Sequence, residues 1–165
     1  MKKLLLHSCC APCSSAVIER LIPDYNITVF FFNPNIVPYD EYQKRLSEQK
    51  RFLKEAHDNS IPLIEGEYSK SGYIPARCEE CFLIRLEETA RLAKEMRFDC
   101  FTTTLTVSSK KKAALINPIA AALSGRYRVE AILDDFKKKN GYNRSIELSK
   151  KYNLYRQNYC GCDGS

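Results

Sequence analysis

Long apolar runs are missing from this 165-residue chain, and their absence limits what it can be. No stretch approaches the roughly 20 apolar residues of a membrane-spanning helix, so we expect no membrane partner. The opening MKKLLLHSCC has an apolar run of only three leucines, which is too short for a secretory signal. The sequence therefore predicts a cytoplasmic protein.

Glycine is absent from the place where nucleotide-binding α/β proteins commonly use it. None of the 6 glycines lies in LLLHSCCAPCSS, the segment that joins the first apolar run to the first helical pattern. A cradle of backbone amides for ATP phosphates is therefore not supported there. Cys9, Cys10 and Cys13 stand in this loop instead, and the sequence raises the question of what these thiols do.

No linker or internal repeat divides the chain, and its length suits one domain with a sizeable core. The hydrophobic content of 44% and the charged content of 28% are those of an ordinary globular protein. A net charge of +6 leaves room for a polyanionic partner without requiring one. The sequence therefore predicts a single domain over residues 1–165.

Strand and helix patterns alternate along this domain. Strand patterns lie at residues 2–7, 27–33, 61–66, 98–105 and 128–133, and helix patterns at 14–22, 39–57, 78–97, 113–123 and 144–154. Such alternation predicts an α/β fold in which a parallel sheet carries helices on both faces. Ligands of open parallel sheets bind at the carboxyl ends of the strands, where the first cysteine cluster lies.

Eight cysteines are the clearest chemical feature of the sequence. In a reducing cytosol they indicate metal binding or catalysis in preference to disulfides. Seven of them fall into three groups, which are Cys9 with Cys10 and Cys13, Cys78 with Cys81, and Cys160 with Cys162. The remaining Cys100 alternates with other side chains on a predicted strand, which favours a buried structural thiol.

The spacing within the groups suits metal ligands. Cys78 and Cys81 share one face at the start of a predicted helix, whose N-terminus favours thiolate. Gly161, between Cys160 and Cys162, lets the tail fold tightly. We hypothesise that all three groups converge, because an isolated pair cannot complete the four-ligand shell of zinc or an iron–sulfur cluster. Seven thiols exceed four, so either some are spare or there are two metal centres.

Other interpretations of the thiols remain open. Cys78 and Cys81 alone could be a chance helical pair, and a structural zinc site would leave three thiols unexplained. Cys10 and Cys13 resemble the thioredoxin motif, although here the motif follows the first strand and has Cys9 beside it. A thioredoxin-like dithiol oxidoreductase predicts two-thiol chemistry without metal. A zinc-bound RNA-binding module predicts zinc without turnover.

A set of motifs resembles the QueH-type epoxyqueuosine reductases. The motifs lie within residues 4–162 and read LLLHSCCAPCSS, FFNPNIVPYDEYQKR, RCEECFLIRLEETARLAKE, FTTTLTVSSKK and GYNRSIELSKKYNLYRQNYCGC. The resemblance implies a single HUP-like domain, related to the ATP-pyrophosphatase fold, whose phosphate loop has become a metal loop. It also implies a cytoplasmic oxidoreductase that reduces epoxyqueuosine to queuosine at the wobble position of tRNA, the final step of queuosine biosynthesis.

The resemblance further implies a [4Fe-4S] cluster with a second, mononuclear metal, expected to be iron, and no cobalamin. Our hypothesis assigns the cluster to Cys10, Cys78, Cys81 and Cys162, and the iron to Cys9, Cys13 and Cys160. The spacing does not determine this division. The two electrons come from a donor that the sequence does not identify.

Two residues are candidate proton donors in this reaction. His7 ends the first predicted strand beside the cysteine loop, and an imidazole pKa suits proton transfer near neutrality. The alternative is that His7 caps the strand or bonds a backbone carbonyl. Asp163, next to the last thiol, is the second candidate for a proton or metal role.

Polar and aromatic residues near the predicted site are candidate substrate contacts, because splayed RNA bases are commonly stacked on rings and guanidinium groups. They are Asn33, Asn35, Tyr42, Arg45, Tyr142, Arg144 and Arg156. Lysines 110–112 and 137–139 are candidates for phosphate contacts, and their alternative is a solvated charged face. Residues 33–45 could instead form an ordinary turn and the start of a helix. The tyrosines could instead pack at the edge of the core and seal it from solvent.

Overall fold

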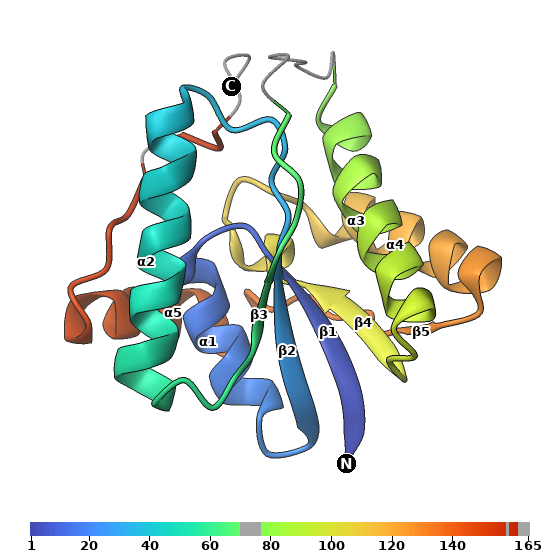
Figure 1. Ribbon diagram of the computed structural model, residues 1–165, viewed down its shortest axis with the longest axis horizontal. Helices are drawn as coiled ribbons and strands as arrows, with labels where there is room; N and C mark the ends of the chain where they lie inside the picture. The colour runs from blue at the N-terminus through green and yellow to red at the C-terminus, as the bar shows by residue number, and fades with distance from the viewer. Residues whose placement is uncertain (70–76, 158, 162–165) are drawn as a thin grey trace.

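A computed structural model describes residues 1–69, 77–157 and 159–161 and contains one parallel sheet (Figure 1). Its strands lie in the order β3-β2-β1-β4-β5. Their bounds are β1 Lys2–Ser8, β2 Tyr25–Phe31, β3 Leu63–Glu65, β4 Cys100–Thr103 and β5 Glu130–Ala131. Every neighbouring pair is parallel, so the predicted α/β fold with a parallel sheet is confirmed. The strand order reverses direction at β1, which makes the end of β1 a topological switch point.

Helices cover both faces of the sheet. They are α1 Ala11–Leu21, α2 Tyr39–His57, α3 Cys78–Glu95, α4 Ala113–Tyr127 and α5 Gly141–Lys151, with a 3₁₀ turn at Leu105–Val107. Figure 1 shows α1, α2 and α5 on one face and α3 with α4 on the other. Two hydrophobic clusters fill the two layers between the sheet and these helices.

The central strand explains why two layers form. Leu4, Leu5 and Leu6 of β1 are each 0% exposed. Leu4 and Leu6 pack in the cluster of α1 and α2, whereas Leu5 packs in the cluster of α3 and α4, because successive side chains of a strand point to opposite faces. An apolar run without alternation is therefore the signature of a strand buried on both faces.

The predicted elements are all present, and several of their boundaries differ. The prediction for α2 matches the structure. Helix α1 begins at Ala11, three residues earlier than predicted, because Pro12 is tolerated in the first helical turn, where backbone N–H groups have no partner within the helix. The strand expected at 128–133 has only two residues, since β5 pairs with β4 alone at the edge of the sheet. The predicted strands at 61–66 and 98–105 shorten to β3 and β4, and the helix expected to end at 123 continues to Tyr127.

The last helix also differs from its prediction. It begins at Gly141, three residues earlier than expected, and ends at Lys151. Asn140, directly before it, has a left-handed backbone with φ 64°, a conformation that asparagine tolerates better than most residues. Of the helices in the described part of the chain, none combines the length and the apolar character of a membrane span.

Truncation of Leu5 tests the two-layer core. We expect Leu5→Ala to lower the free energy of unfolding by about 2–5 kcal/mol, because it removes buried methyl groups and leaves a cavity. The control is Leu115→Ala on α4, where the side chain is 43% exposed, and we expect a change within about 0.5 kcal/mol. Urea unfolding measures both, and equal losses for the two variants would contradict the assignment.

Candidate metal centre

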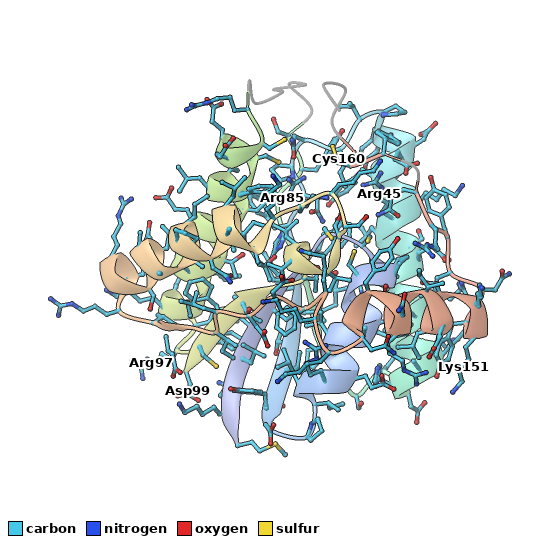
Figure 2. All side chains as sticks on the ribbon, turned by 180° about the vertical axis from the view of Figure 1, so that it is seen from behind. Arg45, Arg85, Arg97, Asp99, Lys151 and Cys160 are labelled. Atoms are coloured by element: carbon cyan, nitrogen blue, oxygen red, sulfur yellow. The ribbon has the colours of Figure 1, made fainter. Side chains whose placement is uncertain are left out.

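The carboxyl ends of the central strands form the edge at which the candidate site lies. Figure 2 shows Arg45, Arg85 and Cys160 grouped toward one end of the molecule, with Arg97 and Lys151 toward the other. Residue pairing aligns the strand ends, since Ser8 of β1 lies opposite Phe31 of β2. The segments that follow β1, β2 and β4 therefore leave the sheet side by side.

Three thiols come together directly after β1. The Sγ atoms of Cys9, Cys10 and Cys13 all lie within 4.8 Å of one another, and those of Cys9 and Cys10 are 3.8 Å apart. The local fold explains the closeness, because Cys10 is the extended residue before α1 and Cys13 lies in the first turn of that helix. Among the described residues, these thiols are the one group of three or more potential ligands with donor atoms this close.

Hydrogen bonds orient the first of these thiols. The Thr104 hydroxyl, which follows β4, accepts from the backbone N–H of Cys9 at 3.2 Å and lies 3.4 Å from its Sγ. Hydrogen bonds with the thiols of Cys10 and Cys13 hold the pKa of Cys9 well below its usual value. The pKa of Cys13 is correspondingly raised, because its proton is held by Cys10 and Cys9 and the group is buried. The three thiols therefore hold their protons unequally, and a bound metal would displace the protons that remain.

The other predicted ligands lie on different segments, and none of those that the structure describes joins this group of three, so the convergence of all three thiol groups stays a prediction. Cys78 is exposed at the start of α3, Cys81 is half-buried one turn later, and Cys160 is exposed on the tail. Cys162 and Asp163 lie outside the described residues. Cys100 is buried at the beginning of β4, as predicted, and its thiol lies 3.8 Å from the carbonyl oxygen of Lys3.

A buried arginine connects Cys81 to the segment after β2. Arg85 of α3 is 5% exposed, and its Nη1 donates to the Sγ of Cys81. Its Nε donates to Asn33 Oδ1 at 3.2 Å, and its Nη2 donates to Asn35 Oδ1 at 2.8 Å. The amide of Asn33 in turn donates to the carbonyl oxygen of Ser8 at 3.0 Å. Both asparagines are buried here, and their contact with substrate stays a prediction.

His7 lies beneath the thiols with both ring nitrogens bonded. Its Nε2 donates to the carbonyl oxygen of Phe32 at 2.9 Å, and its Nδ1 accepts from the Thr103 hydroxyl at 2.9 Å. Burial and then the charge of Arg85 lower the pKa of His7 to about 4, so the ring is neutral near pH 7. The backbone-carbonyl bond that we considered as the alternative is present, and the role of His7 as proton donor stays a prediction.

Arg45 of α2 holds the tail that carries Cys160. Arg45 is 2% exposed and donates to the carbonyl oxygens of Cys160 at 2.8 Å and of Tyr159 at 3.0 Å. Its Nε also pairs with Glu41 at 3.0 Å. The N–H of Val37 donates to the carbonyl oxygen of Gly161 at 2.8 Å. The structure thus gives Arg45 a contact within the protein, and its predicted contact with substrate stays a prediction.

The other candidate substrate residues are placed as follows. Tyr42 is buried, with its hydroxyl 3.5 Å from a carboxylate oxygen of Glu65. Arg144 on α5 pairs with Glu19 of α1 and with Glu147 of its own helix. Tyr142 is half-buried, Arg156 is exposed, and the substrate roles of all four stay predictions.

The lysine runs differ from one another in exposure. Lys110 and Lys112 are exposed after the 3₁₀ turn, at the same edge as the thiols. Lys137 instead donates to the carbonyl oxygens of Thr106 at 2.7 Å and Lys111 at 2.9 Å, so it joins two loops. Lys138 and Lys139 are exposed.

Two residues of the site were not singled out from the sequence. Arg85 stands four residues after Cys81, a spacing that places both side chains on one helix face. This spacing was the signal that could have identified Arg85. Thr104 becomes a neighbour of Cys9 only through the pairing of β4 with β1, which no local pattern shows.

Substitution of Gly161 tests the attachment of the tail. Gly161 has φ +118°, and an added Cβ would lie 2.9 Å from both Arg45 Nη1 and Ile36 Cγ1. We expect Gly161→Ala to cost more than about 1 kcal/mol of unfolding free energy and to speed tryptic cleavage after Arg156. The measurements are urea unfolding and timed proteolysis.

The matched control for this substitution is Gly125→Ala. Gly125 lies in α4 with nothing within 4 Å of the added Cβ, so alanine is expected to stabilise the helix by about 0.5–1 kcal/mol. Equal behaviour of the two alanine variants would show that the tail is not held at Gly161.

The chain is similar to one protein family over nearly its whole length. Residues 4–165 match the family model described as "Epoxyqueuosine reductase QueH". A curated protein of that name from Staphylococcus epidermidis is 40% identical, over 97% of this chain and 74% of its own length. Proteins of the same name from Streptococcus pyogenes, 38% identical over 96% and 68%, and Thermotoga maritima, 33% identical over 98% and 89%, also match.

Solved structures show weaker likeness. A deacetylase crystallised with teicoplanin has a TM-score of 0.48 and 12% identity, over 78% of this chain and 68% of that chain. The zinc-inhibited form of a teicoplanin deacetylase has a TM-score of 0.46. The HUP-like name for the fold stays a prediction.

Proposed function

We propose a metal-dependent mechanism for this chain, which belongs to the QueH family of epoxyqueuosine reductases and is therefore an oxidoreductase of queuosine biosynthesis. In this proposal the thiols hold a [4Fe-4S] cluster and a second metal. The proposed substrate is tRNA with epoxyqueuosine at the wobble position, in the cytoplasm. An electron donor of unidentified nature completes the reaction. The proposal treats residues 1–165 as one metalloenzyme domain whose tail carries the last ligands.

The thiol group after β1 is the observation that carries the proposal. Cys9, Cys10 and Cys13 offer three sulfur donors within 4.8 Å of one another at the switch point of the sheet. Soft thiolate ligands suit iron–sulfur clusters and zinc, so the donor set fits the proposed groups. Three thiols do not complete a four-ligand shell, and further ligands have to come from α3 and the tail.

The division of ligands follows the hypothesis stated from the sequence. We propose that the cluster is held by Cys10, Cys78, Cys81 and Cys162, and the single metal, iron, by Cys9, Cys13 and Cys160. Cys9 and Cys10 then serve different metals although their sulfurs are 3.8 Å apart. This closeness supports two neighbouring metals rather than two separate sites.

The reaction removes one oxygen atom as water and needs two electrons and two protons. When bound, the cluster supplies electrons singly and the second metal acts as a Lewis acid toward the epoxide oxygen. The chain holds and orients the reacting groups. His7 and Asp163 remain the proposed sources of protons, although His7 keeps its Nε2 proton in a bond to Phe32.

Binding of the RNA is the second task of the chain. Lys110 and Lys112 are exposed at the thiol edge, where they suit phosphate contacts. We propose that Arg156 adds a cation from the tail, with Tyr142 and Arg144 as further contacts. Asn33, Asn35, Tyr42 and Arg45 complete the proposed substrate side, although each is buried or engaged within the protein.

Metal analysis of anaerobically purified protein tests the proposal. We expect brown protein with four sulfides per chain and with four irons for the cluster alone or five when the adjacent iron is also bound. The same protein should reduce epoxyqueuosine in tRNA. Colourless protein that keeps one zinc after attempted cluster reconstitution would overturn the mechanism and favour a zinc-bound RNA-binding module.

Replacement of Cys9 tests the division of the thiols. We expect Cys9→Ser to retain the four sulfides while turnover falls by at least about 100-fold, since even residues that only orient a ligand are worth 10- to 100-fold. The control is Cys100→Ala, whose buried thiol lies at the opposite end of β4 from Thr104, and its iron and turnover should match the parent protein. Full turnover in Cys9→Ser would rule out our assignment of that residue.

A further inference from the structure

Arg85 is a buried cation without a carboxylate partner among the described residues. It is 5% exposed, and it forms no ion pair with any carboxylate in the described part of the chain. Arg45 is equally buried but pairs with Glu41 at 3.0 Å. A buried charge is costly unless it is paired and hydrogen-bonded, so the groups that accept hydrogen bonds from Arg85 decide how its charge is stabilised.

Of the described groups that accept hydrogen bonds from Arg85, only the sulfur of Cys81 belongs to an ionisable side chain. The other two acceptors of the guanidinium, the side-chain oxygens of Asn33 and Asn35, are neutral amides. The amide N–H of Asn35 also donates to the Cys81 sulfur at 3.5 Å. Two donors, one of them charged, therefore converge on a single sulfur, an arrangement that suits a sulfur ligand of a metal.

The same contacts connect two thiol-bearing segments. Asn33 accepts from Arg85 and donates to the carbonyl oxygen of Ser8, the residue before Cys9. A change in the position of Arg85 thus bears on the cysteine loop as well as on α3. The hydrogen-bonded chain from Cys81 to Ser8 is fixed by the planar guanidinium, which a lysine ammonium cannot reproduce.

We propose that Arg85 is a positioning residue of the metal centre, which supplies the counter-charge to the Cys81 sulfur and holds that thiol in register with the cysteine loop. The expected effect of Arg85 on a cluster rests on the proposed function, in which Cys81 is one of the cluster ligands. Hydrogen bonds and positive charge at a cluster sulfur favour the reduced, more negative form. Arg85 therefore raises the reduction potential of the cluster.

A double-mutant cycle in metal-free protein tests the partnership between Arg85 and Cys81. The variants are Arg85→Gln, Cys81→Ser and the double variant, and urea unfolding measures their free energies. Contacting groups give non-additive effects, so we expect the double variant to lose clearly less stability than the sum of the two single losses. Strictly additive losses would overturn the partnership. This measurement needs no cluster, so its outcome is separate from that of the proposed function.

Redox titration of cluster-loaded protein tests the effect on the metal. We expect Arg85→Gln to shift the midpoint potential to more negative values and Arg85→Lys, which keeps the charge but loses the fork, to shift it less. The control is Arg91→Gln on the same helix, since Arg91 is exposed and pairs with Glu88 and Glu95. A potential in Arg85→Gln equal to that of the parent and of Arg91→Gln would overturn the proposal and leave Arg85 a purely structural role.

Discussion

β1 lies in the middle of the sheet with helices packed on both of its faces. Its three leucines are fully buried, so the core fixes the position of this strand along its own axis. Pairing with β2 and β4 then sets where each neighbouring strand ends, since Ser8 lies opposite Phe31 and His7 opposite Thr103. The residues that follow these strands meet at one edge. The position of the thiols is thus a consequence of how the apolar core is built.

The polar layer under the thiols follows from the same burial. His7 and Arg85 are both removed from water, and two cations so placed would repel each other at low dielectric. The protein keeps the imidazole neutral, with its proton directed to the carbonyl oxygen of Phe32, and its pKa near 4 reflects burial first and the arginine second. Arg85 keeps its charge beside this neutral imidazole, and its Nη1 donates to the sulfur of Cys81.

Sequence patterns identified the features that local chemistry determines. The apolar run of β1, the helix at Tyr39–His57 and the cysteine loop at the strand end could all be read from neighbouring residues. The burial of Arg45 could not, because it depends on the tail that returns more than a hundred residues later to cover α2. The length of β5 was also hidden, since it is set by its single neighbour in the sheet.

The sequence was least informative about polar residues, because the same types serve a surface and a buried contact. Asn33 and Asn35 follow a strand at the ligand-binding edge, which is where substrate contacts are expected, yet their side chains face Arg85. The one local sequence signal of this arrangement was the four-residue spacing from Cys81 to Arg85, which places both side chains on one helix face. Residue type and position in the fold are therefore insufficient without the long-range pairing.

Two buried arginines bring distant segments to the cysteine loop in different ways. Arg45, neutralised by Glu41, uses its remaining donors on backbone carbonyls and so fixes the course of the tail without adding charge to the site. Arg85 has no such neutralisation among the described residues, and its charge stays available to a sulfur. The first arrangement sets only the position of a thiol, whereas the second also acts on the charge of the thiol. Position and charge at the cysteine loop are therefore set by two different arginines, which approach it from α2 and α3.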